Sequence, residues 1–308
     1  MSQQPASMKT TKVLITGANG QLGYALQKTV PAFLVENGIA IELIALTRAE
    51  FDLSQPDTLG TLLNRYQPDA IINAAAYTAV DKAETDQVQA QAINANAVAV
   101  IARWCEAHNT PLIQVSTDFV FDGKKSSPYL PDDQTNPLGV YGQTKCAGEV
   151  AVLENCSTSY VVRTGWVYCE HGNNFVKTML RLGAERKVLG VVADQVGTPT
   201  YAVNLAQMIW QLLSQRPQQR LFHFSDAGVA SWYDFAVAIF TEAEQAGLLE
   251  QVPQVNPIAT TDYPTPAQRP AYSVLDKRQT WQLLNITPDH WRSALCAMLD
   301  AYKKQQNP

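Results

Sequence analysis

The chain has 308 residues, of which 46% are hydrophobic and 17% are charged, a balance typical of a folded globular protein and not of a disordered one. Its 23 basic and 28 acidic residues give a net charge of −5, which argues against a large nucleic-acid-binding surface, because such surfaces need clustered lysines and arginines. No apolar run reaches the ~20 residues of a membrane span, and five cysteines without a CxxC motif fit a reducing compartment, so we expect a cytoplasmic protein with no nucleic-acid or membrane partner.

Short apolar runs alternate with helical patterns through the first half of the chain. The predicted strands are residues 12–16, 41–46, 70–72, 112–115 and 160–163. One helix is predicted to begin near residue 21, and a second is predicted over residues 85–108. Residues 1–7 are expected to form a loose polar tail. Continuous apolar strands that alternate with helices are typical of a parallel sheet covered on both faces. We therefore predict an α/β fold with a Rossmann-type, doubly wound parallel sheet.

A glycine-rich stretch follows the first predicted strand directly. Its sequence, TGANGQLG over residues 16–23, allows a sharp turn out of the strand and a close approach of a diphosphate to the start of the next helix. A plain tight turn would use glycines in the same way, but the position after the first strand of an α/β pattern favours dinucleotide binding. The cofactor-binding residues predicted here are Gly17, Asn19, Gly20, Gln21, Leu22 and Gly23.

The end of the second predicted strand bears on which dinucleotide binds. NAD sites usually carry an acidic residue there, whereas an arginine suits the 2′-phosphate of NADP. The chain reads Leu46-Thr47-Arg48, so no carboxylate follows the strand directly, and Arg48 is placed to contact a phosphate. The alternative for Arg48 is a solvated loop charge. We predict NADPH as the cofactor, with NADH accepted.

Two tyrosine–lysine pairs have the YxxxK spacing that places both side chains on one face of a helix. Tyr141 and Lys145 follow the fourth predicted strand, and Thr117 stands at the strand end where a parallel sheet holds its reactive groups. Tyr24 and Lys28 lie on the first crossover helix, away from that end, and we interpret them as a chance match. We predict that Tyr141 donates a proton, that Lys145 lowers its pKa, and that Thr117 holds the substrate carbonyl.

The pattern changes after about residue 166, where glycine, proline and asparagine become frequent. A helix is predicted over residues 203–213, a strand over 221–224, and an irregular proline-rich segment over 253–270. We expect a dinucleotide-binding domain and a smaller, discontinuous substrate-binding domain. The predicted boundaries are residues 8–168 and 197–225 for the first domain, and residues 169–196 and 226–308 for the second.

Several longer stretches together resemble the extended short-chain dehydrogenase/reductases and, among them, the dTDP-4-dehydrorhamnose reductase family. These stretches run from the glycine loop almost to the C-terminal region. Besides that loop they are residues 73–84 (NAAAYTAVDKAE), 116–121 (STDFVF), 141–145 (YGQTK), 163–168 (RTGWVY), 172–175 (GNNF), 194–200 (DQVGTPT) and 263–270 (YPTPAQRP).

The resemblance implies roles for the residues at matching positions. Thr117, Tyr141 and Lys145 take the family's catalytic positions, and the last two also contact the cofactor. Further cofactor contacts are implied for Asp52, Leu53, Ala74, Ala75 and Ala76. Substrate contacts are implied for Thr78, Val80, Thr117, Asp118, Trp166, Asn174 and Arg269. Arg269 is expected on the substrate diphosphate, because a guanidinium fork suits phosphate oxygens; core packing for Trp166 and a surface charge for Arg269 are the alternatives.

The implied activity is reduction of dTDP-4-dehydro-L-rhamnose at C4 by NADPH, which gives dTDP-L-rhamnose for cell-surface polysaccharide. Two alternatives stay open. One is a non-catalytic regulatory subunit similar to that of methionine adenosyltransferase, and the other is a reductase or epimerase of another nucleotide sugar. The intact Thr117–Tyr141–Lys145 set favours an enzyme.

The family resemblance also has a departure that concerns metal binding. Some members bind magnesium through carboxylates at a dimer interface, and the acidic residue of their first helix is replaced here by Ala25. The four histidines form no HxxxH or HxxE pattern that would indicate zinc. We therefore predict no metal site, and a chain that is either a monomer or a homodimer.

Overall fold

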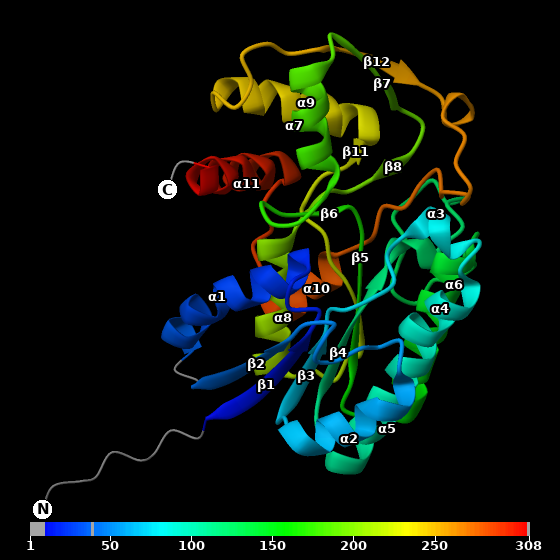
Figure 1. The fold of residues 1–308 in the computed structure, drawn as a ribbon, viewed down its shortest axis with the longest axis vertical. Coiled ribbons are helices and arrows are strands. Elements are labelled where there is room, and N and C mark those ends of the chain that lie inside the picture. The colour runs from blue at the N-terminus through cyan, green and yellow to red at the C-terminus, as the bar shows by residue number, and fades with distance from the viewer. Residues whose placement is uncertain (1–9, 38–39, 307–308) are drawn as a thin grey trace, which may run out of the picture.

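A six-stranded parallel sheet forms the centre of the larger part of the molecule (Figure 1). The computed structural model describes residues 10–37 and 40–306, and the predicted tail over residues 1–7 lies outside the described residues. The strand order is β10-β5-β4-β3-β1-β2. In that order the strands are Leu221–His223, Tyr160–Thr164, Leu112–Thr117, Ala70–Asn73, Thr11–Thr16 and Ile41–Leu46. This arrangement confirms the predicted Rossmann-type fold and all six predicted strands to within a few residues.

Helices cover both faces of this sheet, because successive strand residues point to opposite sides and are apolar on each. In β1, Val13 and Ile15 pack in the same core cluster as Leu26 and Trp210, whereas Leu14 packs in the cluster of the opposite face. The first face is covered by α1 (Gln21–Asn37), α8 (Ala202–Gln215) and α10 (Arg278–Leu284). The second face is covered by α2 (Pro56–Tyr66), α5 (Ala97–His108) and α6 (Val140–Asn155).

The helical region predicted over residues 85–108 is helical but not regular. It consists of α4 (Gln87–Gln91), a π-helical turn η1 (Ala92–Asn96) and α5, and the short α3 (Val80–Ala83) precedes it. Within η1 the Asn94 amide donates to the Tyr77 carbonyl and to Thr144 Oγ1, and its Oδ1 accepts the Tyr77 N–H at 2.9 Å. Through Asn94 the wider turn connects the loop after β3 with α6.

The smaller part of the molecule has a core of its own, built from α7 (Phe175–Glu185), α9 (Trp232–Gln245) and α11 (Trp291–Gln306). Three two-stranded sheets join it to the large sheet or cover its edge. They are β6 (Val167–Tyr168) with β9 (Thr200–Tyr201), β7 (Val188–Val192) with β12 (Gln254–Ile258), and β8 (Val196–Gly197) with β11 (Ala230–Ser231). We keep the predicted division into two domains as a proposal, which this second core supports.

The prediction of an irregular segment over residues 253–270 is wrong for its first part, which contains the strand β12. β12 pairs in parallel with β7 along five residues, from Gln254 opposite Val188 to Ile258 opposite Val192. A strand with a partner on one side only tolerates Pro257, because the missing N–H is not needed on the open side. Two 3-10 turns, η2 (Asp118–Val120) and η3 (Thr260–Asp262), complete the described elements. None of the helices in the described ranges is both long and apolar enough to cross a membrane.

Candidate functional site

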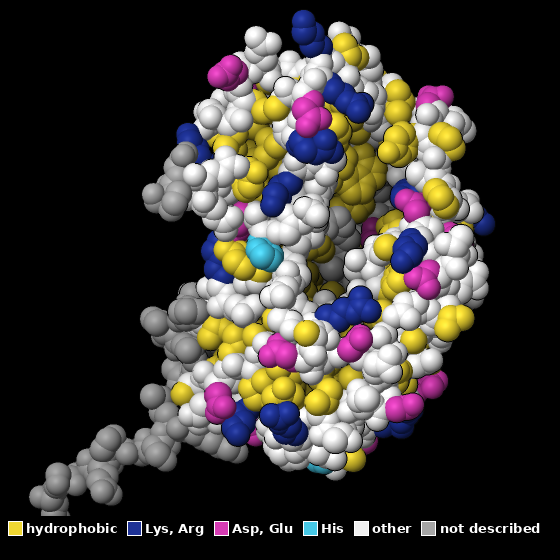
Figure 2. Space-filling model, in the orientation of Figure 1, with side chains coloured by type: hydrophobic (Ala, Val, Ile, Leu, Met, Phe, Trp, Pro, Cys, Tyr) yellow, Lys and Arg dark blue, Asp and Glu magenta, His cyan; other side chains and the backbone are white. Residues whose placement is uncertain are grey.

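A pocket of about 650 Å³ opens at the carboxyl ends of the central strands, between the two parts of the molecule (Figure 2). Most of the residues predicted from the sequence line it together. They are Gly17, Asn19, Gly20, Gln21, Leu22, Arg48, Asp52, Leu53, Ala74, Ala75, Ala76, Thr78, Val80, Thr117, Asp118, Tyr141, Lys145 and Trp166. Three predicted residues, Gly23, Asn174 and Arg269, do not line it. A position at this strand edge is where open α/β sheets bind their ligands.

The glycine loop connects β1 to α1 with almost no spare volume. Gly17 has φ +68, and a Cβ on it would lie 3.0 Å from the backbone of Ala75. A Cβ on Gly23 would lie 2.2 Å from the Gly17 carbonyl oxygen, so this glycine allows α1 to pack closely on the loop, and its predicted cofactor contact stays a prediction. Because α1 begins at Gln21, its free N–H groups face the pocket beside Gly20. The chemistry of this loop fits a dinucleotide diphosphate.

Two acidic side chains, Glu50 and Asp52, follow the end of β2 and contact the residues around Arg48. Arg48 is exposed over 74% of its side chain and lines the pocket, with its Nε 3.5 Å from Asp52 Oδ1. The Glu50 carboxylate folds back and accepts the backbone N–H and the hydroxyl of Thr47, and these hydrogen bonds lower its pKa. Asp52 therefore shares the charge of Arg48, whereas Glu50 bonds Thr47. Local turn geometry of this kind was not visible in the sequence pattern.

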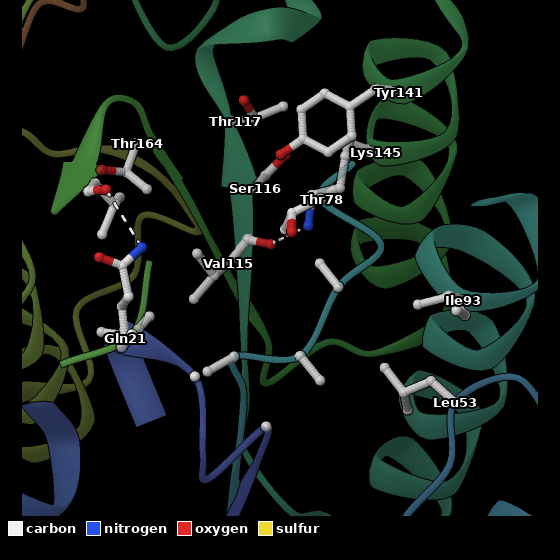
Figure 3. A pocket seen from close by; sticks show the side chains of 18 of the residues that line it. Gln21, Leu53, Thr78, Ile93, Val115, Ser116, Thr117, Tyr141, Lys145 and Thr164 are labelled. Carbon is white, nitrogen blue, oxygen red and sulfur yellow. Dashed lines mark hydrogen bonds between the residues drawn. The ribbon is translucent and has the colours of Figure 1, made fainter. Parts of the chain in front are cut away.

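The predicted catalytic residues come from two elements that meet at the end of β4 (Figure 3). Thr117 ends β4, and its hydroxyl donates to Asp118 Oδ1 at 3.1 Å. Tyr141 and Lys145 lie on α6, and Lys145 Nζ donates to the Val115 carbonyl at 2.6 Å. Figure 3 shows these side chains grouped at one end of the pocket. Their predicted catalytic roles stay predictions.

Burial sets the protonation of these groups. It raises the pKa of Tyr141 to about 12, although the nearby Thr117 side chain opposes the rise, and it lowers the pKa of Lys145 to about 8. The expected lowering of the Tyr141 pKa by Lys145 is therefore not found, because the Lys145 ammonium is turned to the Val115 carbonyl. Burial also raises the pKa of Asp118 to about 6. Tyr141 is a neutral phenol at neutral pH, the form that a proton donor needs.

Two neighbours of this group were missed from the sequence. The Ser116 hydroxyl also lines the pocket, and it is buried without a hydrogen-bond partner among the described residues. Glu84 accepts the backbone N–H of Val140 at 2.9 Å, which places a carboxylate at the N-terminus of α6, where the helix dipole favours it. Glu84 therefore helps to fix the helix that carries Tyr141 and Lys145.

The second tyrosine–lysine pair has a different location. Tyr24 and Lys28 do not line the pocket. The Tyr24 ring stacks on His171 with centroids 4.6 Å apart, and Lys28 Nζ lies 2.5 Å from the fully buried Glu170 carboxylate. His171 in turn contacts the Asn19 carbonyl in the glycine loop at 3.0 Å. This pair ties the chain after β6 to α1.

Asn174 and Arg269 have protein partners in the structure. Asn174 Oδ1 accepts the Lys177 N–H and so caps the N-terminus of α7, while its Nδ2 donates to Gln21 Oε1 at 2.9 Å. The Arg269 guanidinium makes a two-point contact with the Asp81 carboxylate on α3, at 2.8 and 3.1 Å. That contact lowers the pKa of Asp81. Their predicted substrate contacts stay predictions.

A glycine loop at the end of β1 and a Thr–Tyr–Lys group at the end of β4 define an α/β protein of the short-chain dehydrogenase/reductase class. A family model described as the RmlD substrate binding domain matches residues 11–304. The chain therefore belongs to the RmlD family, the family of the dTDP-4-dehydrorhamnose reductases.

Named relatives and solved structures agree with this membership. The dTDP-4-dehydrorhamnose reductase of Aggregatibacter actinomycetemcomitans is 45% identical over 289 residues, which cover 92% of this chain and 97% of that protein. The Escherichia coli (strain K12) reductase is 40% identical, with 94% and 97% covered. A crystal structure of the Bacillus anthracis dTDP-4-dehydrorhamnose reductase in complex with NADP superposes with a TM-score of 0.86 at 34% identity, covering 95% of this chain and all (100%) of that one.

Proposed function

We propose that this chain is an NADPH-dependent reductase of dTDP-4-dehydro-L-rhamnose, which it converts at C4 to dTDP-L-rhamnose. The observation that carries the proposal is the meeting of Thr117, Tyr141 and Lys145 with the glycine loop in one pocket. Relatives at 39–45% identity are named for this activity and match nearly the whole chain. The intact group favours a catalyst over a regulatory subunit.

The dinucleotide would be held by the chain's own backbone at one side of the pocket. The diphosphate fits the glycine loop and the first N–H groups of α1, and the adenosine end fits the region of Arg48, Asp52 and Leu53. The unpartnered Ser116 hydroxyl supplies a further polar contact in the same pocket. When bound, the cofactor supplies the hydride.

Tyr141 then acts on the substrate oxygen. Its neutral phenol donates the proton that the new hydroxyl group needs, and burial keeps that proton in place until the reaction takes it. Thr117 lines the pocket with Tyr141, and its hydroxyl proton is directed to Asp118, which leaves the hydroxyl oxygen to accept from a bound group. Lys145 lines the same pocket one helical turn from Tyr141, and its ammonium is held by the Val115 carbonyl, from which it can donate to a bound cofactor.

The proposal extends to the substrate diphosphate, the compartment and the metal. We propose that Arg269 leaves Asp81 or shares it when the nucleotide sugar binds, since its partner Asp81 directly follows the pocket-lining Val80. We propose that the reaction takes place in the cytoplasm and needs no metal, and that the enzyme acts as a monomer or a homodimer. Among the described residues no group of three or more His, Cys, Asp and Glu side chains is arranged to hold a metal ion.

Oxidation of NADPH with a panel of nucleotide 4-keto sugars tests the proposal. We expect the highest kcat/KM with dTDP-4-dehydro-L-rhamnose and an L-rhamno product by NMR. A UDP- or GDP-linked 4-keto sugar that reacts better would replace the substrate named here. No oxidation with any member of the panel, from protein that still binds NADPH, would support the regulatory alternative.

A further inference from the structure

Trp166 has a backbone conformation that a bulky side chain rarely adopts. Its φ is +51, in the left-handed region. The other described non-glycine residues with positive φ each end a helix: they are Gln67, Asn109, Arg216 and Asn285, the C-caps of α2, α5, α8 and α10. Trp166 lies instead in the turn between β5 and β6. Strain of this kind persists only where neighbouring groups hold it, and it concentrates at ligand sites.

Trp232 is the neighbour that holds the Trp166 side chain. The two indole rings are stacked with centroids 3.5 Å apart and an interplanar angle of 5°, so they overlap almost completely. Phe175 adds a further aromatic contact to Trp232 at 4.7 Å. The second-core cluster packs beneath all three side chains. Stacked aromatic pairs add stability beyond the area that they bury.

The short sheet of β8 and β11 places this stack. Ala230 pairs with Gly197 and Ser231 with Val196, so Trp232 follows the pairing directly as the first residue of α9. A Cβ on Gly197 would lie 2.7 Å from the Trp166 indole, so only glycine leaves room for the ring. Ser231 caps α9 by accepting the Asp234 N–H at 3.0 Å, which fixes the direction in which Trp232 leaves the strand.

The stack is anchored next to the reactive end of the pocket. Gly165, the residue before Trp166, lies against Asp118, and a Cβ on it would be 2.6 Å from the carboxylate. Asp118 accepts the hydroxyl proton of Thr117. Trp166 lines the pocket, whereas Trp232 does not. Any ring that offers its reacting carbon to Thr117 and Tyr141 therefore lies beside the Trp166 indole.

We propose that Trp232 is a positioning residue for the substrate: it holds Trp166 in its left-handed conformation, so that the indole presents a fixed apolar wall to the hexose ring. The proposal rests on the proposed function for the identity of the hexose. A flat aromatic surface suits the C–H face of a sugar ring, and a wall that is ordered before binding costs less entropy than one that must be ordered by the ligand. Neither Trp232 nor its stack was indicated by the sequence.

The test compares Trp232→Ala and Trp232→Phe with a control, Trp104→Phe, which changes a tryptophan stacked on His108 away from the pocket. From the strength of aromatic pairs we expect Trp232→Ala to raise the KM for the nucleotide sugar roughly 2- to 12-fold, with kcat and the Kd for NADPH nearly unchanged. Trp232→Phe should recover part of the affinity. The near-UV circular dichroism couplet of two stacked indoles should disappear in Trp232→Ala and in Trp166→Phe but stay in the control.

Two results would overturn the proposal. One is a lost couplet with an unchanged KM, which would mean that the stack does not act on the substrate. The other is an equal loss of NADPH and sugar affinity, which would show a general effect on the fold. A titration with dTDP-L-rhamnose gives the same comparison without turnover. If the wild-type chain binds this product but reduces no 4-keto sugar, the proposed function fails while the role of Trp232 is still decided.

Discussion

Replacing Tyr141 by phenylalanine should nearly abolish turnover and leave the fold and the cofactor site intact. The ring keeps its edge contact with Phe119, whose centroid is 5.6 Å away at 74°, so packing is preserved. Thr117 keeps both of its partners, the Asp118 carboxylate and the Phe119 N–H. We therefore expect a stability change of about 1 kcal/mol or less. Removing a general acid typically slows a reaction about 10²- to 10⁴-fold.

That range corresponds to about 3–5 kcal/mol of barrier, which is well above any effect expected on binding. The measurements are kcat from the loss of NADPH absorbance, the Kd for NADPH by fluorescence titration, and Tm. Tyr24→Phe is the matched control, because Tyr24 has the same YxxxK spacing but stacks on His171 outside the pocket. If Tyr141→Phe turns over at a near-normal rate, or if Tyr24→Phe is the slower variant, the assignment of the proton donor is wrong.

Four other outcomes are expected. Arg48→Ala should weaken the binding of NADPH more than that of NADH. The loss should be smaller than the roughly 10- to 150-fold of an unshared charge-assisted hydrogen bond, because Asp52 shares the guanidinium charge. Equal losses in paired Kd measurements would refute a 2′-phosphate contact. Arg269→Ala should raise the KM for the nucleotide sugar and leave the Kd for NADPH almost unchanged; the opposite pattern would assign Arg269 to the cofactor or to the fold. Burial raises the pKa of Asp118 from 3.8 to about 6, so the folded chain binds this proton more tightly than the unfolded chain does. The ionised carboxylate therefore destabilises the fold. This destabilisation grows as pH rises from about 4 to 6 and stays at its maximum above pH 6. Asp118→Asn should therefore stabilise the fold more at pH 7 than at pH 4, and the two gains in unfolding free energy should differ by up to about 3 kcal/mol. Tm measured at both pH values checks this, and an equal gain at both would contradict the pKa shift. Activity should survive EDTA, and full loss that magnesium restores would show a metal requirement.

The sequence could predict the features that repeat locally. Apolar runs located the strands of the sheet, and the position of the glycine loop after β1 located one side of the pocket. It could not predict features that depend on contacts between distant segments. Asn94 in the π-helical turn bonds Thr144, which is 50 residues away, and Arg269 pairs with Asp81, which is 188 residues away. A single sequence contains no signal for such pairs, and for the same reason the proline-rich segment concealed β12.

The two YxxxK pairs show where spacing stops being informative. Spacing places a tyrosine and a lysine on one face of a helix, and it does so equally for Tyr24–Lys28 and Tyr141–Lys145. What separates them is how closely each helix approaches the strand ends. α6 contains two interior glycines whose added Cβ atoms would meet backbone carbonyls, Gly142 at 2.3 Å from the Phe119 oxygen and Gly148 at 2.2 Å from the Asn94 oxygen. Interior glycines cost a helix about 1 kcal/mol each, a cost that close backbone contact explains here. Gly142 allows α6 to lie against the turn that follows β4, Gly148 allows it to lie against η1, and this approach brings Tyr141 and Lys145 to the pocket that Thr117 also lines.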